Sequence, residues 1–157
     1  MYTCSLDTPI GKLIIEADDS HVYYIGFKDI LEESPNSVCL KAKEELEEYF
    51  AGKRKIFEFP ISQAGTEFQQ KVWQELLKVP IGYPISYTAL SRKMNNPLAI
   101  RAIASANGKN NLMIVVPCHR IIGANGDLVG YAGGLWRKKW LLEHEAKMTG
   151  IGQTMLF

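Results

Sequence analysis

The fold class follows from residues 86–108, which read SYTALSRKMNNPLAIRAIASANG. Ser86 is a good N-cap residue, and it predicts a short helix. Asn96 and Pro97 suit the N-cap and the first position of a second helix, which we expect to end at Gly108. Two short helices joined by a tight turn are typical of a helix-turn-helix, although many other helical proteins contain such corners.

The second predicted helix has two different faces. Ile100 and Ile103 lie on an apolar face that suits core packing. The opposite face carries one long cation, Arg101, among small residues such as Ala104 and Ser105. Such a face lets the helix backbone approach a partner closely, as the minor groove of DNA requires. The alternative is a small-residue helix packed on another helix, with Arg101 in solvent.

The first sixty residues predict a small α/β unit. Residues 11–17 and 21–27 are rich in β-forming residues and flank a polar loop, which favours an antiparallel hairpin. A helix is predicted over residues 37–51 and one further strand over residues 56–59. The apolar residues of this helix recur at helical spacing: Leu40, Leu46 and Phe50. No part of this unit has catalytic spacing.

The rest of the chain predicts mostly helix. Residues 66–69, TEFQ, have the form of a helix start, and a last helix is predicted over residues 135–147. We therefore expect an α+β fold in two domains. Residues 1–62 form a small N-terminal α/β domain, a short antiparallel sheet plus a helix, and residues 63–157 form a mostly helical, winged helix-turn-helix-like C-terminal domain.

Charge is divided unevenly along the chain. Residues 1–60 carry seven Lys and Arg against twelve Asp and Glu, whereas residues 61–157 carry eleven against five. A polyanionic partner therefore suits the second part, unless the charge only solvates its surface. No apolar run approaches the ~20 residues needed to span a bilayer, and the first residues do not resemble a signal peptide. We expect a cytoplasmic protein.

One cysteine stands in an unusual setting. The three cysteines are an odd number without CxxC spacing, which argues against a disulfide framework. Cys118 follows a buried apolar run, residues 112–116, that we expect to be extended. His119 and Arg120 come next, and a nearby base or cation favours the reactive thiolate. Adjacent side chains rarely bond directly, so we expect His119 to act through a bridging water, with Glu145 as its orienting partner.

Two downstream segments have open interpretations. Residues 130–134, GYAGG, are either a plain turn or a loop whose N–H groups and Tyr131 phenol point into a pocket. Arg137, Lys138 and Lys139 form a basic run at a helix start. We interpret this run as a solvated or phosphate-facing surface.

These segments resemble one known family. Pro117-Cys118-His119-Arg120-Ile121 is similar to the active-site signature of the O6-alkylguanine-DNA alkyltransferases. The resemblance extends from about Phe68 to Glu145. Its further motifs are Ile85-Ser86-Tyr87, Asn96-Pro97, Arg101-Ala102-Ile103, Asn110, Tyr131-Ala132-Gly133-Gly134-Leu135 and Trp140-Leu141-Leu142-Glu143-His144-Glu145.

The resemblance implies repair of alkylated DNA by a single-turnover methyltransferase. Cys118 takes the alkyl group from O6-alkylguanine, with O4-alkylthymine as an alternative substrate, after the base is flipped through the minor groove. His119 and Glu145 take up the thiol proton, and Tyr131 donates a hydrogen bond to the base. The implied DNA-binding residues are Tyr87, which crowds a phosphate, Arg101, which fills the stack, and Ala102, Ser105 and Arg120. The implied pocket residues are Tyr131, Ala132, Asn110, which also braces the turn before the cysteine, and Trp136.

The implied partner is double-stranded DNA containing O6-alkylguanine, bound by a monomer without a cofactor. We expect no structural metal, because Cys4, Cys39 and His21 have no recognisable zinc spacing. Two other functions share some of these features. A non-catalytic DNA-binding module would not need the thiol, and a cysteine hydrolase would need a base that reaches the thiol directly, together with an oxyanion hole.

Overall fold

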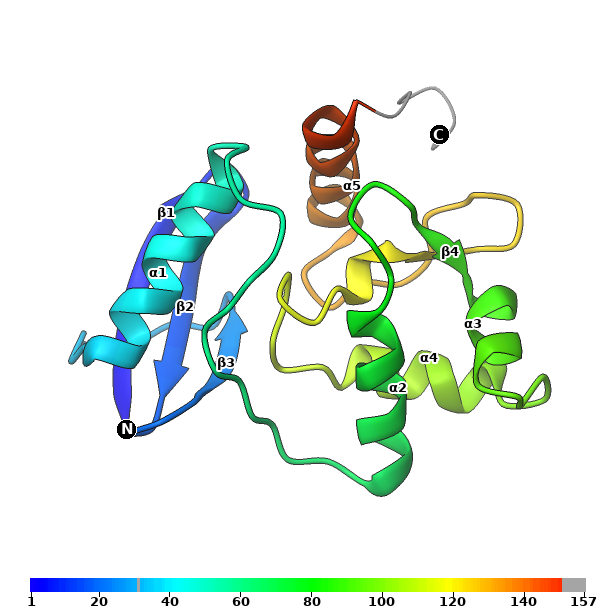
Figure 1. Ribbon diagram of the computed structural model, residues 1–157, viewed down its shortest axis with the longest axis horizontal. Coiled ribbons are helices and arrows are strands. Elements are labelled where there is room, and N and C mark those ends of the chain that lie inside the picture. Colours follow the sequence, from blue (N-terminus) through cyan, green and yellow to red (C-terminus); the bar gives the residue numbers. More distant parts are fainter. Residues whose placement is uncertain (31, 151–157) are drawn as a thin grey trace. The chain divides into compact units, whose positions relative to one another are not determined.

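The computed structural model describes residues 1–30 and 32–150, which form the α+β fold predicted from the sequence (Figure 1). The chain divides into two compact units. The first contains Met1–Ala64 with Asn111–Met113, and the second contains Gly65–Asn110 with the described residues from Ile114 onward. Residues 151–157, which belong to the predicted C-terminal domain, lie outside the described residues.

The first unit is a three-stranded antiparallel sheet covered by one helix. The strands are β1 (Tyr2–Thr8), β2 (Gly11–Ala17) and β3 (Val22–Gly26), in that order, and α1 (Ser37–Phe50) lies across β1 and β2 (Figure 1). The predicted hairpin of β2 and β3 is confirmed. The sequence does not predict β1, because small polar residues alternate there with Cys4 and Leu6, a pattern that is also common in loops.

The packing face of α1 differs slightly from the predicted one. The helix starts where the Asn36 side chain accepts a hydrogen bond from the Cys39 N–H (2.9 Å). Its buried apolar residues are Cys39, Ala42, Leu46 and Tyr49. Leu40, which we expected in the core, is 49% exposed.

The strand predicted over residues 56–59 is wrong. The Glu58 N–H donates to Oε1 of Glu45 (2.7 Å), and the Ile56 carbonyl accepts a hydrogen bond from Arg54 (2.9 Å). Side chains thus satisfy backbone groups that a strand would have paired in a ladder. These partners lie outside the segment, so its own sequence does not show them.

The second unit is mostly helical. It contains α2 (Glu67–Leu77), α3 (Tyr87–Lys93), α4 (Ile100–Gly108) and α5 (Leu135–Thr149), together with a 3₁₀-helix, η1 (Cys118–Arg120). The strands β4 (Ile85–Ser86) and β5 (Ile121–Ile122) pair in parallel. Since β4 leads directly into α3 and β5 directly follows η1, this pairing holds the start of α3 close to η1.

Local capping signals define α2 and α3 as predicted. Thr66 and Gln69 form a complete capping box at the start of α2, and Ser86 accepts a hydrogen bond from the Ala89 N–H at the start of α3. Trp73 of α2 is buried, and its indole N–H donates to the Ala106 carbonyl of α4 (2.9 Å). This bond ties α2 to α4.

The start of α4 differs from the prediction. Asn96 and Pro97 do not begin the helix; they belong to a turn in which the Ala99 N–H donates to the Asn96 carbonyl (3.1 Å). The helix begins at Ile100, without a side-chain cap, and ends at Gly108 as predicted. Ile100, expected in the core, is 38% exposed, whereas Ile103 is fully buried.

The apolar run before Cys118 is buried, but it is not extended as we expected. The chain turns over residues 113–116, and Ile114 adopts a φ of 74°, which is strained for a β-branched residue. Asn110 closes this turn by donating from Nδ2 to the Val116 carbonyl (2.8 Å). Cys118 therefore emerges at the start of η1 rather than from a strand.

The last helix, α5, starts at Leu135 as predicted and follows Gly134, whose φ of 93° suits glycine. Leu141, Leu142 and Ala146 form its buried apolar face. No helix in the described part of the chain is both long and apolar enough to cross a bilayer.

We predict that Thr66→Ala lowers the free energy of unfolding by about 1 kcal/mol, because it removes the side-chain acceptor of the capping box at α2. Urea denaturation of the full chain measures this change. Thr66→Ser, which keeps the hydroxyl, is the matched control and should stay close to the parent. Equal stability of the alanine and serine variants would contradict a role for the cap.

Candidate active site

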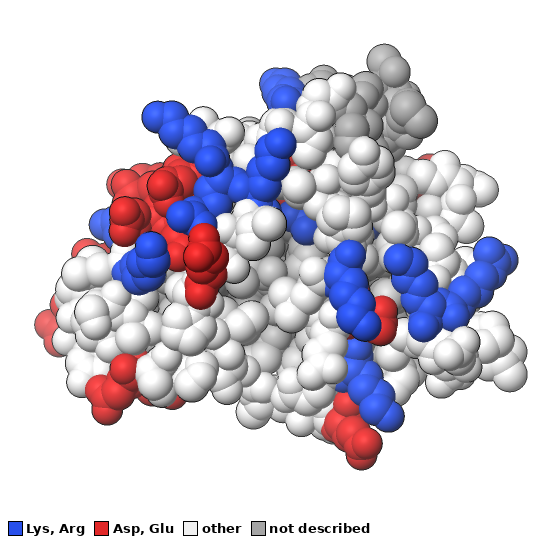
Figure 2. All heavy atoms as spheres, in the orientation of Figure 1, with Lys and Arg blue, Asp and Glu red and all other residues white. Residues whose placement is uncertain are grey.

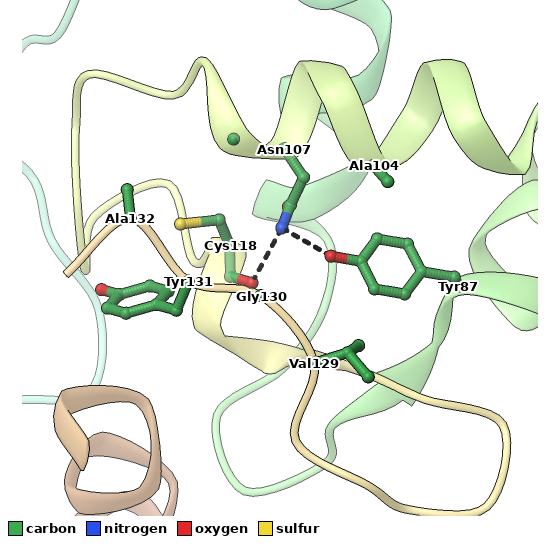
Figure 3. Close-up of a pocket in the computed structure, with 9 residues that line it drawn as sticks. Tyr87, Ala104, Asn107, Cys118, Val129, Gly130, Tyr131 and Ala132 are labelled. Carbon is green, nitrogen blue, oxygen red and sulfur yellow. Dashed lines mark hydrogen bonds between the residues drawn. The ribbon is translucent and has the colours of Figure 1, made fainter. Parts of the chain in front are cut away.

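A pocket of about 280 Å³ opens beside Cys118 within the second unit (Figure 3). It is formed by α3, α4, the start of η1 and the loop before α5. Its lining residues are Tyr87, Ala104, Asn107, Gly108, Cys118, Val129, Gly130, Tyr131 and Ala132. The structure thus brings together Cys118, Tyr87, Tyr131 and Ala132, which the sequence analysis had named separately.

The Cys118 thiol is held in its protonated form. The residue is only 3% exposed, and burial raises the pKa of its thiol. A hydrogen bond with the Asn110 side chain and the positive charge of Lys138 lower this pKa, but not enough to offset burial. The neighbouring cation Lys138 thus favours the thiolate, as expected, but burial outweighs it, and a base is needed to make the nucleophile.

His119 and Arg120 both bind Glu145 of α5 in a buried cluster. The Nε2 of His119 lies 2.7 Å from Oε2 of Glu145. Arg120 donates from Nε to Oε1 (2.8 Å) and from Nη2 to Oε2 (3.0 Å) of the same carboxylate. The three side chains are at most 9% exposed, so water does not screen these contacts.

The protonation states in this cluster follow from its charges. Burial raises the pKa of Glu145, but the charges and hydrogen bonds of His119 and Arg120 outweigh it and hold the pKa well below its usual range. Burial lowers the pKa of His119 despite the attraction of Glu145. His119 is therefore neutral at pH 7. Because a carboxylate only accepts hydrogen bonds, the proton of the ring sits on Nε2 and the lone pair on Nδ1.

The Nδ1 atom of His119 is buried and has no hydrogen-bond partner among the described residues. A neutral imidazole with one nitrogen oriented by a carboxylate and a free lone pair on the other is equipped to accept a proton. Since the preceding residue in the chain, Cys118, carries the thiol that must lose a proton, this cluster suits general-base chemistry.

Arg120 does not fit the DNA-binding role that we expected. Its side chain is buried, and besides its two bonds to Glu145 it donates from Nη1 to the Val79 carbonyl (2.8 Å). The guanidinium thus orders the base cluster and is not available at the surface.

Lys138 lies in a different environment from the predicted one. We interpreted it as part of a solvated basic run, but it is fully buried. Its Nζ donates to the carbonyls of Ile121 (2.6 Å), Val129 (2.7 Å) and Gly130 (3.2 Å), which ties one wall of the pocket to β5. Burial lowers its pKa from 10.5 to about 8. Helical spacing from Leu141, Leu142 and Glu145 places Lys138 on the buried face of α5, and that spacing was a usable signal.

Two residues predicted in the pocket lie elsewhere. Trp136 is 56% exposed, and the Arg137 guanidinium stacks over its ring at 4.7 Å. Asn110 is buried behind Cys118, where it closes the turn at Val116. By contrast, Tyr131 lines the pocket, and its hydroxyl is buried without a hydrogen-bond partner in the described part of the chain. Burial raises the pKa of Tyr131 well above its usual value, which keeps the phenol as a donor.

One face of α4 is open to solvent. Arg101, Ala102, Ala104, Ser105 and Gly108 are exposed, whereas Ile103 and Ala106 are buried. A Cβ placed on Gly108 would contact nothing within 4 Å, so the backbone itself is accessible there. Figure 2 shows that basic side chains outnumber acidic ones over α3 and α4 on the face it displays.

The described residues contain no group of three or more His, Cys, Asp and Glu side chains that could hold a metal ion. Asn107, which had no role in the sequence analysis, lies in the pocket between Tyr87 and Cys118 (Figure 3).

Comparisons with known proteins cover nearly the whole chain. The family described as "6-O-methylguanine DNA methyltransferase, ribonuclease-like domain" matches residues 1–63, and "6-O-methylguanine DNA methyltransferase, DNA binding domain" matches residues 67–147. The chain is 42% identical over 145 residues to the constitutive methylated-DNA–protein-cysteine methyltransferase of Bacillus subtilis, covering 84% of this chain and 87% of that protein. It is 40% identical over 155 residues to the methylated-DNA–protein-cysteine methyltransferase of Methanosarcina acetivorans, covering 92% and 98%.

A solved structure supports the same grouping. The Mycobacterium tuberculosis protein OGT in complex with DNA matches with a TM-score of 0.86 and 37% sequence identity, over 94% of each chain.

The buried Lys138 predicts a pH dependence of stability. Its pKa is about 8 in the folded protein and near 10.5 when unfolded, so between these values the unfolded chain holds a proton that the folded protein has lost. The free energy of unfolding of the parent should therefore rise from pH 8 to 10.5 relative to that of Lys138→Met, by up to roughly 3 kcal/mol. Urea denaturation at a series of pH values measures this difference. A difference that stays constant over this window would contradict a depressed pKa at Lys138.

Proposed function

This chain belongs to the 6-O-methylguanine DNA methyltransferase family, which repairs DNA by alkyl transfer to a protein cysteine, and we propose that Cys118 is the acceptor. The observation that carries this proposal is the position of Cys118: a buried thiol in a pocket, next to a neutral histidine held by a carboxylate. The substrate is O6-alkylguanine in double-stranded DNA, with O4-alkylthymine as an alternative.

The transfer is a displacement at the alkyl carbon. The Cys118 proton passes to Nδ1 of His119 by way of a water molecule, and Glu145 stabilises the imidazolium that forms. The sulfur forms a bond to the alkyl carbon while the bond from that carbon to O6 breaks, leaving its electron pair on the base. Tyr131 donates a hydrogen bond to this developing anion. The proton finally reaches the base, so the products are S-alkylcysteine and guanine.

The exposed face of α4 suits the DNA contact. The side chains on this face are small, so the helix can enter a minor groove while Arg101 reaches into the base stack. The small residues are Ala102, Ala104, Ser105 and Gly108. Tyr87 crowds the phosphate beside the lesion. Extrusion of the damaged base costs a few kcal/mol of stacking and brings the O6 substituent to the buried thiol.

The remaining expectations complete the proposal. The reaction uses no metal and no cofactor, and the protein acts as a cytoplasmic monomer. Residues 63–157 carry the chemistry and the DNA contact, while residues 1–62 serve as a scaffold domain. Each molecule reacts once, because a thioether is a very poor leaving group.

We predict that incubation with an oligonucleotide containing O6-methylguanine adds one methyl group per protein molecule, on Cys118, without metal or cofactor. Intact-mass analysis and peptide mapping measure the mass gain and its position. Cys118→Ala should gain nothing, and Cys39→Ala, which removes another buried thiol, should react like the parent. A methyl group on Cys4 or Cys39, or more than one methyl group removed per protein molecule, would contradict the mechanism.

We also predict that Arg101→Ala slows repair of duplex DNA strongly but weakens duplex binding only modestly, because general affinity is spread over many phosphate contacts. Repair of the free base, O6-methylguanine, requires no extrusion and should be nearly unchanged. Single-turnover rates on the two substrates and a binding titration measure these effects. Equal slowing of both reactions would mean that Arg101 belongs to the pocket and that the placement of α4 in the minor groove is wrong.

A further inference from the structure

Asn107 occupies the centre of the pocket and contacts two of its functional residues (Figure 3). It lies near the end of α4 and is 5% exposed. Its Nδ2 donates to the hydroxyl of Tyr87, the first residue of α3 (3.2 Å), and to the backbone carbonyl of Cys118 (3.4 Å). The proposed mechanism assigns it no task, although its buried Oδ1 has no hydrogen-bond partner among the described residues, and an unsatisfied buried oxygen is costly.

The orientation of this amide is determined by its partners. The Cys118 carbonyl has only lone pairs, so the atom that faces it must be the NH₂ group and not the amide oxygen. The second hydrogen of the same NH₂ group points to the Tyr87 hydroxyl. The amide therefore cannot rotate by half a turn without facing one carbonyl with another.

This orientation sets the direction of the Tyr87 hydroxyl in turn. Because its oxygen accepts a hydrogen bond from Asn107, its own hydrogen has to point away from the amide. The hydroxyl has no second hydrogen-bond partner in the part of the chain that the structure describes, and Tyr87 lines the pocket. Burial raises the pKa of this phenol, which keeps the hydrogen in place. The hydrogen is thus left for a molecule bound in the pocket.

We propose that Asn107 is a positioning residue for alkyl transfer, which holds the Tyr87 hydroxyl as a donor toward a ring nitrogen of the alkylated guanine. This inference rests on the proposed function. The ring nitrogens of O6-alkylguanine are hydrogen-bond acceptors, and they share the negative charge that arises when the bond to O6 breaks. A donor at one of them stabilises the transition state more than the bound substrate, whereas a phenol turned the other way would present a lone pair to the same atom.

The test uses substitutions that change the polarity of this contact. Asn107→Asp keeps the shape of the side chain, but its carboxylate only accepts, so the Tyr87 hydroxyl turns toward it and away from the base. Asn107→Leu removes both hydrogen bonds at similar volume. Each is made in the parent and in Tyr87→Phe, and single-turnover methyl transfer from free O6-methylguanine is followed by intact mass. Asn125→Asp, at an exposed turn residue, is the matched control and should react like the parent.

We expect Asn107→Asp to slow transfer about tenfold or more in the parent but less than about threefold in Tyr87→Phe, because the effect acts through the hydroxyl. Asn107→Leu should show the same coupling with a smaller loss. An introduced carboxylate that acted only on the Cys118 thiol, or a loosened fold, would slow both backgrounds by the same factor, and this result would overturn the proposal. The Tm of each variant reports on the fold independently.

Substrate analogues give a second readout. In 1-deaza, 3-deaza and 7-deaza O6-methylguanine, one ring nitrogen is replaced by CH. We expect the parent protein to react more slowly with one of the three analogues than with O6-methylguanine. In Asn107→Asp and in Tyr87→Phe, that analogue and O6-methylguanine should react at similar rates. If no analogue shows this dependence, Asn107 does not act through a base contact. Failure of the parent to accept any methyl group would instead refute the proposed function itself, so the two failures are distinguishable.

Discussion

The packing of the second unit depends on one buried charge, the carboxylate of Glu145. It is 1% exposed, and a charge in such a place is stable only when it is fully paired. His119 and the Nε and Nη2 groups of Arg120 supply this pairing, and Nη1 of Arg120 donates to the Val79 carbonyl beyond the end of α2. A single buried charge thus connects α5, η1 and the segment after α2. Removal of one partner would leave an uncompensated buried charge, which typically costs about 3–5 kcal/mol.

The same arrangement explains the chemistry available at Cys118. Because Arg120 already compensates Glu145, the carboxylate can orient His119 without forcing a proton onto it, and burial keeps the imidazole neutral. A second buried cation, Lys138, donates hydrogen bonds to three backbone carbonyls that shape the pocket wall. Both cations near the thiol therefore have structural partners, and neither produces a resting thiolate. Proton removal is left to a base that is already in position.

Features encoded by adjacent residues could be predicted from the sequence, whereas features that depend on distant partners could not. The capping box at Thr66, the N-cap at Ser86, the β2–β3 hairpin and the end of α4 at Gly108 are local, and the structure has them. Three predictions were wrong because the acceptors involved lie far away in the chain. These predictions are the strand at residues 56–59, the DNA-binding role of Arg120 and the solvated position of Lys138. The helical spacing of Lys138 from Leu141, Leu142 and Glu145 indicates a buried position, but nothing near it in the sequence indicates the three carbonyls that it binds. The family signature pointed to Cys118, His119 and Tyr131, but no local pattern pointed to Asn107, whose partners are 20 and 11 residues away.

The raised pKa of the Cys118 thiol has a consequence for a protein proposed to react only once. The thiolate is the form that oxidants and stray electrophiles attack, so a cysteine kept protonated and 3% exposed is protected while it waits for a lesion. A permanently lowered pKa would speed the transfer but would also expose the only acceptor to irreversible loss. A thiol and a base that both stay neutral until the proton is transferred meet both demands. The thiolate then forms only when a bound substrate can react with it. The buried Glu145 cluster makes this possible by holding a neutral base beside a neutral thiol.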